Sequence, residues 1–182
     1  MKRLLALTAS ALCLGLSACA TDGSRSEPTY EAAARNELVS TNYRAADVLL
    51  GQLRNLDNEG PMLVATLVNI DALERSSTLG RLVSEQVAAR FAQQGRAMIE
   101  LKLRHTMYMR RTEGELALTR EIAEVARQHN ARAILLGSYG LSGDMVFVNL
   151  KVVQPGNNLV LAAYDYALPL NREVRSLLGL PG

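Results

Sequence analysis

The sequence predicts an α/β domain in which helices pack on a mixed β-sheet, in the order α-β-α-β-α-β-β-β. Apolar residues recur at helical spacing in separate stretches, and short apolar runs lie between these stretches. Two longer segments of alternating polarity follow near the C-terminus, joined by turn residues. Because strand–helix–strand connections are right-handed and join parallel strands, the first three strands should be parallel. The closing antiparallel hairpin should then make the sheet mixed.

The first helix is predicted over residues 42–56, where small and aliphatic side chains recur at helical spacing. The segment Asn58-Glu59-Gly60-Pro61 should end it, because glycine and proline interrupt helices. Met62 to Val68 is then an apolar run without a charge, which is typical of a strand covered on both faces.

The second helix is predicted over residues 78–94, with Ser77 or Thr78 as its N-terminal cap. It should end at Gln94-Gly95, since glycine readily adopts the left-handed conformation found after helix C-termini. One apolar stripe along this helix consists of Leu79, Val83, Val87 and Phe91. We expect this stripe to lie in the core.

The central part of the chain contains two more core strands and a third helix. A strand is predicted at about 97–103, followed by a loop from His105 to Arg111. Thr112-Glu113-Gly114-Glu115 has the spacing of a capping box and predicts a helix through about His129. Ala133 to Gly137 is predicted to be the third core strand.

The last two strands are predicted at about 144–154 and 158–168, joined by the turn residues Pro155-Gly156-Asn157-Asn158. Tyr164 and Tyr166 share one face of the second of these strands. Tyrosines on an exposed edge strand would form a candidate interaction surface, because they bury area and still form hydrogen bonds. The alternative is ordinary packing beneath the helices.

The N-terminus has the pattern of a bacterial lipoprotein signal. Two basic residues precede the apolar run Leu4 to Leu16, which is shorter than the roughly 20 residues of a membrane-spanning helix. Small residues directly precede the cysteine in Leu16-Ser17-Ala18-Cys19, as in a lipobox. This predicts that Cys19 becomes the first mature residue and carries a diacylglycerol on sulfur and an acyl chain on its amine. The alternative is an ordinary signal peptide that is cut beside a cysteine.

The predicted organisation has four parts: a signal peptide at 1–18, a lipidated cysteine with a polar tether at 19–41, the α/β domain at 42–170, and a C-terminal tail at 171–182. Ala20 follows the lipidated cysteine, where the known sorting pattern places aspartate in proteins retained at the inner membrane. We therefore expect a lipid anchor in the outer membrane, with the domain on the periplasmic face.

The charge of the mature chain is balanced. The full chain has 20 Lys and Arg, and removing Lys2 and Arg3 with the signal leaves 18 basic residues against 18 Asp and Glu. Such a surface gives no electrostatic reason to expect nucleic-acid binding. The only cysteine besides Cys19 is Cys13, which lies in the signal, so we expect the domain to fold without disulfides.

Patterns typical of catalysis, metal binding or phosphate binding are weak. The glycines between Gly137 and Gly143 precede a predicted strand, whereas a phosphate cradle requires a helix there, so a wide hairpin turn is the better interpretation. Two isolated histidines do not suggest a metal site. Glu113 and Glu115 are explained by capping. Arg110-Arg111 is a candidate contact for an anionic headgroup or a partner, or else a solvated loop pair. We expect no enzyme activity, no small-molecule substrate and no cofactor other than the lipid.

Several segments resemble the FlgO family of flagellar outer-membrane lipoproteins. They are Tyr43-Arg44-Ala45-Ala46-Asp47, Pro61 to Asp71, Ser76-Ser77-Thr78-Leu79-Gly80-Arg81, Glu85-Gln86, Gly114 to Glu121, Leu136-Gly137-Ser138-Tyr139 and Leu161 to Tyr166. The resemblance covers about residues 42–168 and extends more distantly to the CsgG periplasmic domain and the TolB N-terminal domain. It implies a compatible α/β fold, no catalytic residues, and a structural or assembly role in the flagellum.

A second interpretation is a general envelope adaptor or secretion-associated lipoprotein of the TolB or CsgG type, without a flagellar role. Partners would be flagellar or other envelope proteins. Assembly of copies of this chain into a homo-oligomer through the antiparallel edge of the sheet is a geometric alternative.

Overall fold

The computed structural model describes residues 29–54, 60–73, 75–100, 122 and 124–181. The chain divides into two compact units, residues 1–35 and residues 36–182. In the first unit, helix α1 (Tyr30–Ala34) is capped by Thr29, whose hydroxyl accepts a hydrogen bond from the Ala32 amide at 3.2 Å. The second unit contains the sheet and the helices that cover it.

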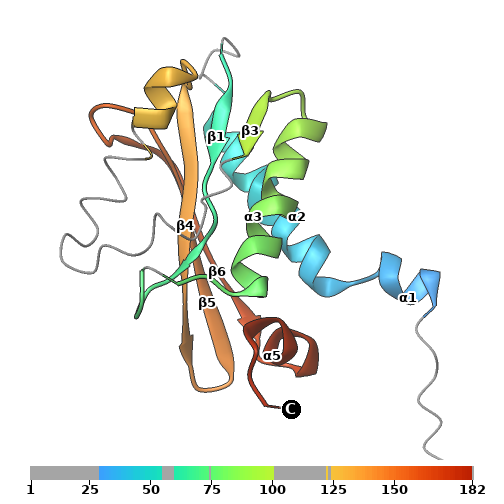
Figure 1. The fold of residues 1–182 in the computed structure, drawn as a ribbon. Coiled ribbons are helices and arrows are strands. Elements are labelled where there is room, and N and C mark those ends of the chain that lie inside the picture. The colour runs from blue at the N-terminus through green and yellow to red at the C-terminus, as the bar shows by residue number, and fades with distance from the viewer. Residues whose placement is uncertain (1–28, 55–59, 74, 101–121, 123, 182) are drawn as a thin grey trace, which may run out of the picture. The chain divides into compact units, whose positions relative to one another are not determined.

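The sheet is mixed (Figure 1), and its strands are β1 (Met62–Val64), β2 (Val68–Asn69), β3 (Met98–Glu100), β4 (Ala133–Ser142), β5 (Met145–Val153) and β6 (Val160–Pro169). The hydrogen-bonded order is β3-β1-β4-β5-β6, and β2 pairs with β4. β1 is parallel to both β3 and β4, whereas β4, β5 and β6 are successively antiparallel. The predicted α/β class, with three parallel strands and an antiparallel C-terminal hairpin, is confirmed.

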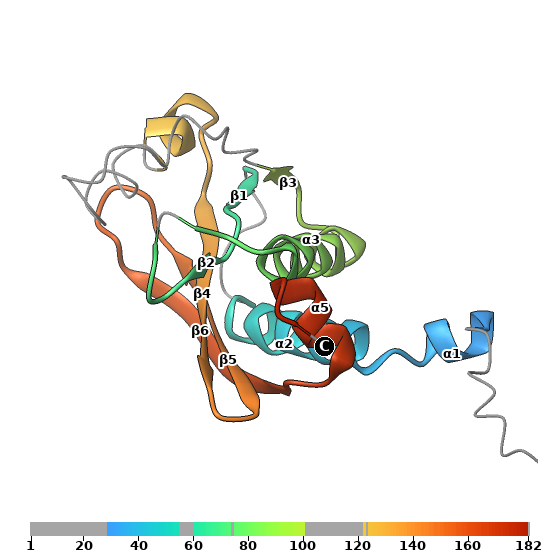
Figure 2. The same cartoon turned by 60° about the horizontal axis from the view of Figure 1, so that its bottom comes forward.

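Helices cover the two faces of the sheet unequally. α2 (Glu37–Gln52), α3 (Thr78–Gln93) and α5 (Arg172–Leu178) lie on one face, as Figures 1 and 2 show. The core beneath them includes Leu49, Leu79, Phe91, Leu135, Val148 and Leu150. Helical residues 122 and 124–128, yellow in Figure 1, lie on the opposite face and bury a second, smaller cluster. Beyond this cluster, that face carries exposed residues such as Phe147 and Asp165.

Helix α2 corresponds to the first predicted helix. It begins at Glu37, five residues before the predicted position, and ends at Gln52. Asn36 explains the early start, because its side-chain oxygen caps the helix by accepting a hydrogen bond from the Val39 amide at 3.2 Å. Its side-chain nitrogen donates to Glu173 at the start of α5, at 2.9 Å. Residues that the sequence assigned to the tether therefore belong to the second unit.

The apolar run from Met62 to Val68 forms two short strands, not one, and the chain between them contacts α3. The Leu67 amide donates a hydrogen bond to the Ser84 hydroxyl at 2.8 Å, and the Leu67 carbonyl accepts one from the Ser76 hydroxyl at 2.7 Å. These side chains satisfy a backbone that leaves the sheet. Gly80 lets the helix approach closely, since a Cβ there would lie 2.6 Å from the Leu67 oxygen.

Helix α3 corresponds to the second predicted helix and matches that prediction closely. Ser77 is its N-cap and accepts a hydrogen bond from the Gly80 amide at 3.1 Å. Gly95 follows the C-cap with a left-handed φ of +82°. The predicted stripe is buried along its whole length: Leu79, Val83, Val87 and Phe91.

Polar contacts join the exposed sides of α2 and α3. Arg90 forms two hydrogen bonds to the Asp47 carboxylate, at 2.8 and 3.1 Å. The same guanidinium lies over the Tyr43 ring, 5.6 Å from its centroid. Tyr43 and Asp47 thus have a structural role, although a solvent-exposed ion pair of this kind contributes little to stability.

The C-terminal half differs from the prediction in two places. β4 extends to Ser142 and turns directly into β5 at Gly143, whose φ is +57°, so the glycine segment is strand and tight turn, and not a wide loop. The predicted tail contains helix α5, whose Val174 is buried in the main core.

Some predictions fall outside the described residues. They concern the lipid signal with Cys19, His105, Arg110, Arg111 and the capping box at 112–115, and they stay predictions.

The outer edge of β6 is capped by a side chain. The Gln52 amide nitrogen donates to the Ala163 carbonyl at 3.0 Å, and the Ala163 amide donates to the Gln52 side-chain oxygen at 3.1 Å. Gln52 thereby occupies a pair of backbone groups that another strand could otherwise use. Blocking an edge in this way protects a sheet from unwanted pairing.

Gln52→Glu is expected to lower the free energy of unfolding by about 1–2 kcal/mol at pH 7, because a carboxylate oxygen would face the Ala163 carbonyl in place of a donor. Repulsion from the Ala163 carbonyl oxygen disfavours the charged form, so the folded-state pKa of the new carboxyl rises. Stability relative to wild type should therefore recover as the pH falls from the raised folded-state pKa to the unfolded-state value of about 4.3, and recovery should be nearly complete at about pH 4. Urea denaturation at both pH values measures this, with Gln94→Glu, at an exposed position at the end of α3, as control. Equal stability of Gln52→Glu and wild type at pH 7 would contradict the capping role.

Candidate interaction surface

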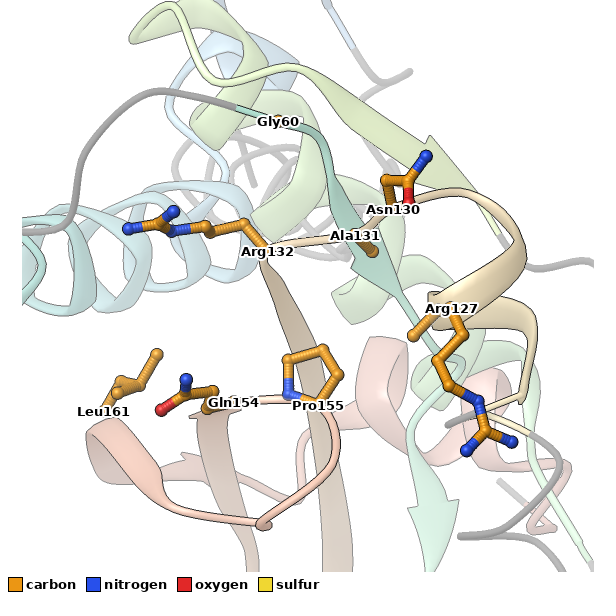
Figure 3. A pocket seen from close by; sticks show the side chains of 9 residues that line it. Gly60, Arg127, Asn130, Ala131, Arg132, Gln154, Pro155 and Leu161 are labelled. Carbon is orange, nitrogen blue, oxygen red and sulfur yellow. The ribbon is translucent and has the colours of Figure 1, made fainter.

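A metal site and a ligand pocket place different requirements on the described residues. No group of His, Cys, Asp or Glu among them could hold a metal ion. A hollow of about 980 Å³ lies between the end of helical residues 124–128 and the turn after β5. Figure 3 shows that Arg127 and Arg132 at this hollow point away from each other. Arg127 is paired with Glu124. The hollow therefore lacks a convergent set of polar groups.

On the face opposite α2, α3 and α5, the part that no described helix covers carries a cluster of apolar residues on β4, β5 and β6. Phe147 is 54% exposed in the middle of β5, and its cross-strand neighbours are Gly140 on β4 and Ala167 on β6. Met145 lies two residues before Phe147 on the same face and is 36% exposed. Ile70 follows β2 and is 59% exposed. We define Ile70, Gly140, Met145, Phe147 and Ala167 as the open-face patch.

Gly140 makes this patch continuous. A Cβ at Gly140 would lie 2.8 Å from the Ile70 Cγ2 atom, so the isoleucine rests on the bare backbone of the glycine. Ile70 is held there by its backbone, since its amide donates to the Tyr139 carbonyl at 2.9 Å. A shallow hollow of about 610 Å³ lies over these residues.

Polar side chains surround the patch. The next cross-strand row consists of Ser138, Asn149 and Asp165. The Asn149 side-chain nitrogen donates a hydrogen bond to the Asp165 carboxylate. Asp71 follows Ile70 and Asp144 precedes Met145, and both are exposed. An apolar centre with a polar rim is the usual anatomy of a protein interface.

The tyrosine pair lies on the opposite, helix-covered face. Tyr164 and Tyr166 are stacked with their ring centroids 6.1 Å apart, and both pack against the main core. The Tyr166 hydroxyl donates to the Asn42 side-chain oxygen, and the Asn42 side-chain nitrogen donates to Gln86 at 2.6 Å. Of the two interpretations, the structure therefore shows packing beneath the helices and not an exposed interaction surface.

This hydrogen-bond chain stabilises a buried polar residue, because Asn42 is completely buried. Burial raises the pKa of Tyr166, and the neighbouring Tyr164 raises it further. The hydroxyl thus stays protonated and remains a donor to Asn42.

Sequence reasoning did not select Phe147 or Ile70. A signal was present in β5, where Val146, Val148 and Leu150 alternate with other residues. This alternation places Phe147 on the same face as Asn149 and Lys151, which are polar and indicate solvent. A large aromatic residue on a polar face is more informative than an aromatic residue in the core.

Comparisons with known proteins agree with this description. The family model described as FlgO protein matches residues 43–173. The LpoB C-terminal domain from Escherichia coli has a TM-score of 0.51 and 11% sequence identity, over 73% of this chain and 98% of that domain. The same domain from Salmonella enterica has a TM-score of 0.50 and 9% identity, over 69% and 95%. No curated protein matches the sequence. The structural likeness shows a shared fold.

Proposed function

Because this chain belongs to the FlgO family, we propose that it is a non-catalytic lipoprotein of the outer membrane that supports assembly or stability of the flagellum. The observation that carries the proposal is the family match, which covers residues 43–173 and thus nearly the whole second unit. Membership supports the coarser statement that the chain is an envelope lipoprotein of a structural or adaptor type. The flagellar role is the finer part of the proposal.

The open-face patch fits a role that depends on protein contacts. Its apolar side chains are presented on the sheet, where neighbouring strands fix their positions. A rigid surface with an exposed aromatic centre is suited to binding another protein.

We propose that lipid chains on Cys19 attach the protein to the membrane. No helix in the described part of the chain is long and apolar enough to cross a bilayer. A diacylglycerol and an amide-linked chain on one cysteine exceed the two lipid signals needed for stable anchoring, at about 0.8 kcal/mol per buried methylene. Such an anchor would hold the domain at the outer membrane permanently.

Cys19→Ser is expected to abolish lipid attachment and to prevent sorting to the outer membrane, because serine has no thiol to form the thioether. Metabolic labelling with radioactive palmitate and separation of the two membranes measure both effects. Cys13→Ser is the matched control, since it makes the same chemical change inside the predicted signal. Labelling of the Cys19→Ser protein, or no labelling of wild type, would contradict the anchor.

Deletion of the gene in its own host tests the flagellar role. We expect reduced swimming and fewer intact flagella, restored by wild type and not by Cys19→Ser. Unchanged swimming and flagellar number would instead favour the second candidate, a general envelope adaptor of the TolB or CsgG type. That alternative shares the anchor and the open-face patch.

A further inference from the structure

We propose that the open-face patch binds a segment of a partner protein whose apolar side chains are flanked by lysine or arginine. This inference rests on the proposed function only in that the chain acts through protein contacts. It adds the chemistry of the partner and names the residues that select it.

The apolar centre is large enough to act as an anchor. Phe147, Ile70 and Met145 are all exposed. Phe147 and Met145 lie on β5, and Ile70 rests on the bare backbone of Gly140, which pairs with Phe147. Single exposed apolar residues are common, whereas a contiguous group framed by polar residues marks an interaction site. The shape is a shallow hollow and not a deep cavity, which fits side chains of a protein segment better than a small molecule.

The rim of the patch is acidic. Asp71, Asp144 and Asp165 are exposed, and within the described part of the chain none of them forms an ion pair. Asp165 accepts a hydrogen bond from the neutral Asn149 side chain, so its negative charge is not cancelled. Among the described residues, the basic ones that backbone contacts place near this region are Lys151, two rows from Phe147, and Arg75, whose carbonyl accepts from the Asn69 amide.

The excess of carboxylates at the rim distinguishes a protein segment from a membrane surface as the binding partner of the patch. Complementary charge favours a basic segment and opposes an anionic membrane surface, which would face three aspartates. The patch also differs in this respect from the other exposed apolar pair, Leu159 and Val160, which lies at the far end of β6.

Binding of defined peptides tests the proposal. The full lipidated chain is placed in nanodiscs of phosphatidylcholine, and two labelled peptides with the same leucine-rich centre are compared, one flanked by lysine and one by glutamate. We expect the lysine-flanked peptide to bind about tenfold more tightly, with a preference that falls as salt rises. Fluorescence anisotropy measures both affinities.

Two variants assign the effect to the patch. Phe147→Ala should weaken binding of the lysine-flanked peptide by about tenfold, whereas Leu159→Ala, at similar exposure, should leave it unchanged. Asp165→Asn should reduce the preference for lysine over glutamate while leaving the apolar contact in place. Circular dichroism confirms that each variant is folded.

Several outcomes would overturn the proposal. They are equal affinity for the two peptides, unchanged affinity of Phe147→Ala, binding that follows the anionic lipid content of the disc, and self-association of the chain that Phe147→Ala abolishes. These binding outcomes do not depend on whether the protein has a role in the flagellum. A normal deletion strain with selective peptide binding would reject the flagellar role alone, and a motility defect without selective binding would reject this inference alone.

Discussion

Gly80→Ala is expected to lower the free energy of unfolding by about 1–3 kcal/mol, although alanine favours helix more than glycine does. A Cβ at this position would lie 2.6 Å from the Leu67 oxygen, 2.8 Å from the Ser76 Oγ atom and 2.9 Å from the Tyr139 ring. The first of these is backbone and cannot rotate away. The helix would have to move outward, which would also strain the Ser84 contact to the Leu67 amide.

Urea denaturation followed by circular dichroism measures this loss. Gly51→Ala is the matched control, because Gly51 is also in a helix and nothing lies within 4 Å of its added Cβ. That variant should gain about 1 kcal/mol from helix propensity. A Gly80→Ala protein as stable as Gly51→Ala would show that α3 does not rest on the Leu67 backbone.

Phe91→Ala is expected to have the larger cost, about 3–5 kcal/mol, because it removes a fully buried ring and leaves a cavity in the main core. The chain has two phenylalanines, which allows a direct comparison. Phe147→Ala removes the same atoms from an exposed position and should change stability by only about 0.5 kcal/mol.

Thermal and urea unfolding of the two variants provide the measurement. The pair separates stability from recognition, since Phe91→Ala should reduce the amount of folded protein and Phe147→Ala should affect peptide binding alone. Equal destabilisation by the two substitutions would mean that the open-face patch is covered in the folded protein.

Much of the fold follows from local patterns in the sequence. The stripe on α3, its Ser77 cap and the Gly95 end depend on residues close together in the chain, and the structure confirms each of them. Parallel pairing of the first three strands follows from the handedness of their connections. These features need no knowledge of distant contacts.

The errors lie where distant residues decide the outcome. The early start of α2 depends on Asn36, which also contacts Glu173, 137 residues away. The break between β1 and β2 depends on side chains from α3 and the loop before it, which bond to Leu67. The hydrophobic pattern indicates a polar tether in the first case and one continuous apolar run in the second. It does not show which backbone groups are satisfied by side chains.

The candidate site was less accessible to prediction than the fold. Tyr164 and Tyr166 were candidates because they are aromatic residues on one face of the last strand. That strand lies at the edge of the sheet, but α2 covers the face that carries the tyrosines. Which face of a strand is covered depends on the packing of helices, and β6 alternates too weakly to reveal it. The stronger alternation of β5 points to Phe147 once its polar neighbours are considered.

The contact between Asn36 and Glu173 has a mechanical consequence. The chain enters the second unit at Asn36, so any pull exerted through the preceding residues arrives at this point. The hydrogen bond to Glu173 shares that force between the beginnings of α2 and α5, the first and last helices of the unit. Tension transmitted through those residues would therefore be borne jointly by two helices that pack on the same sheet face.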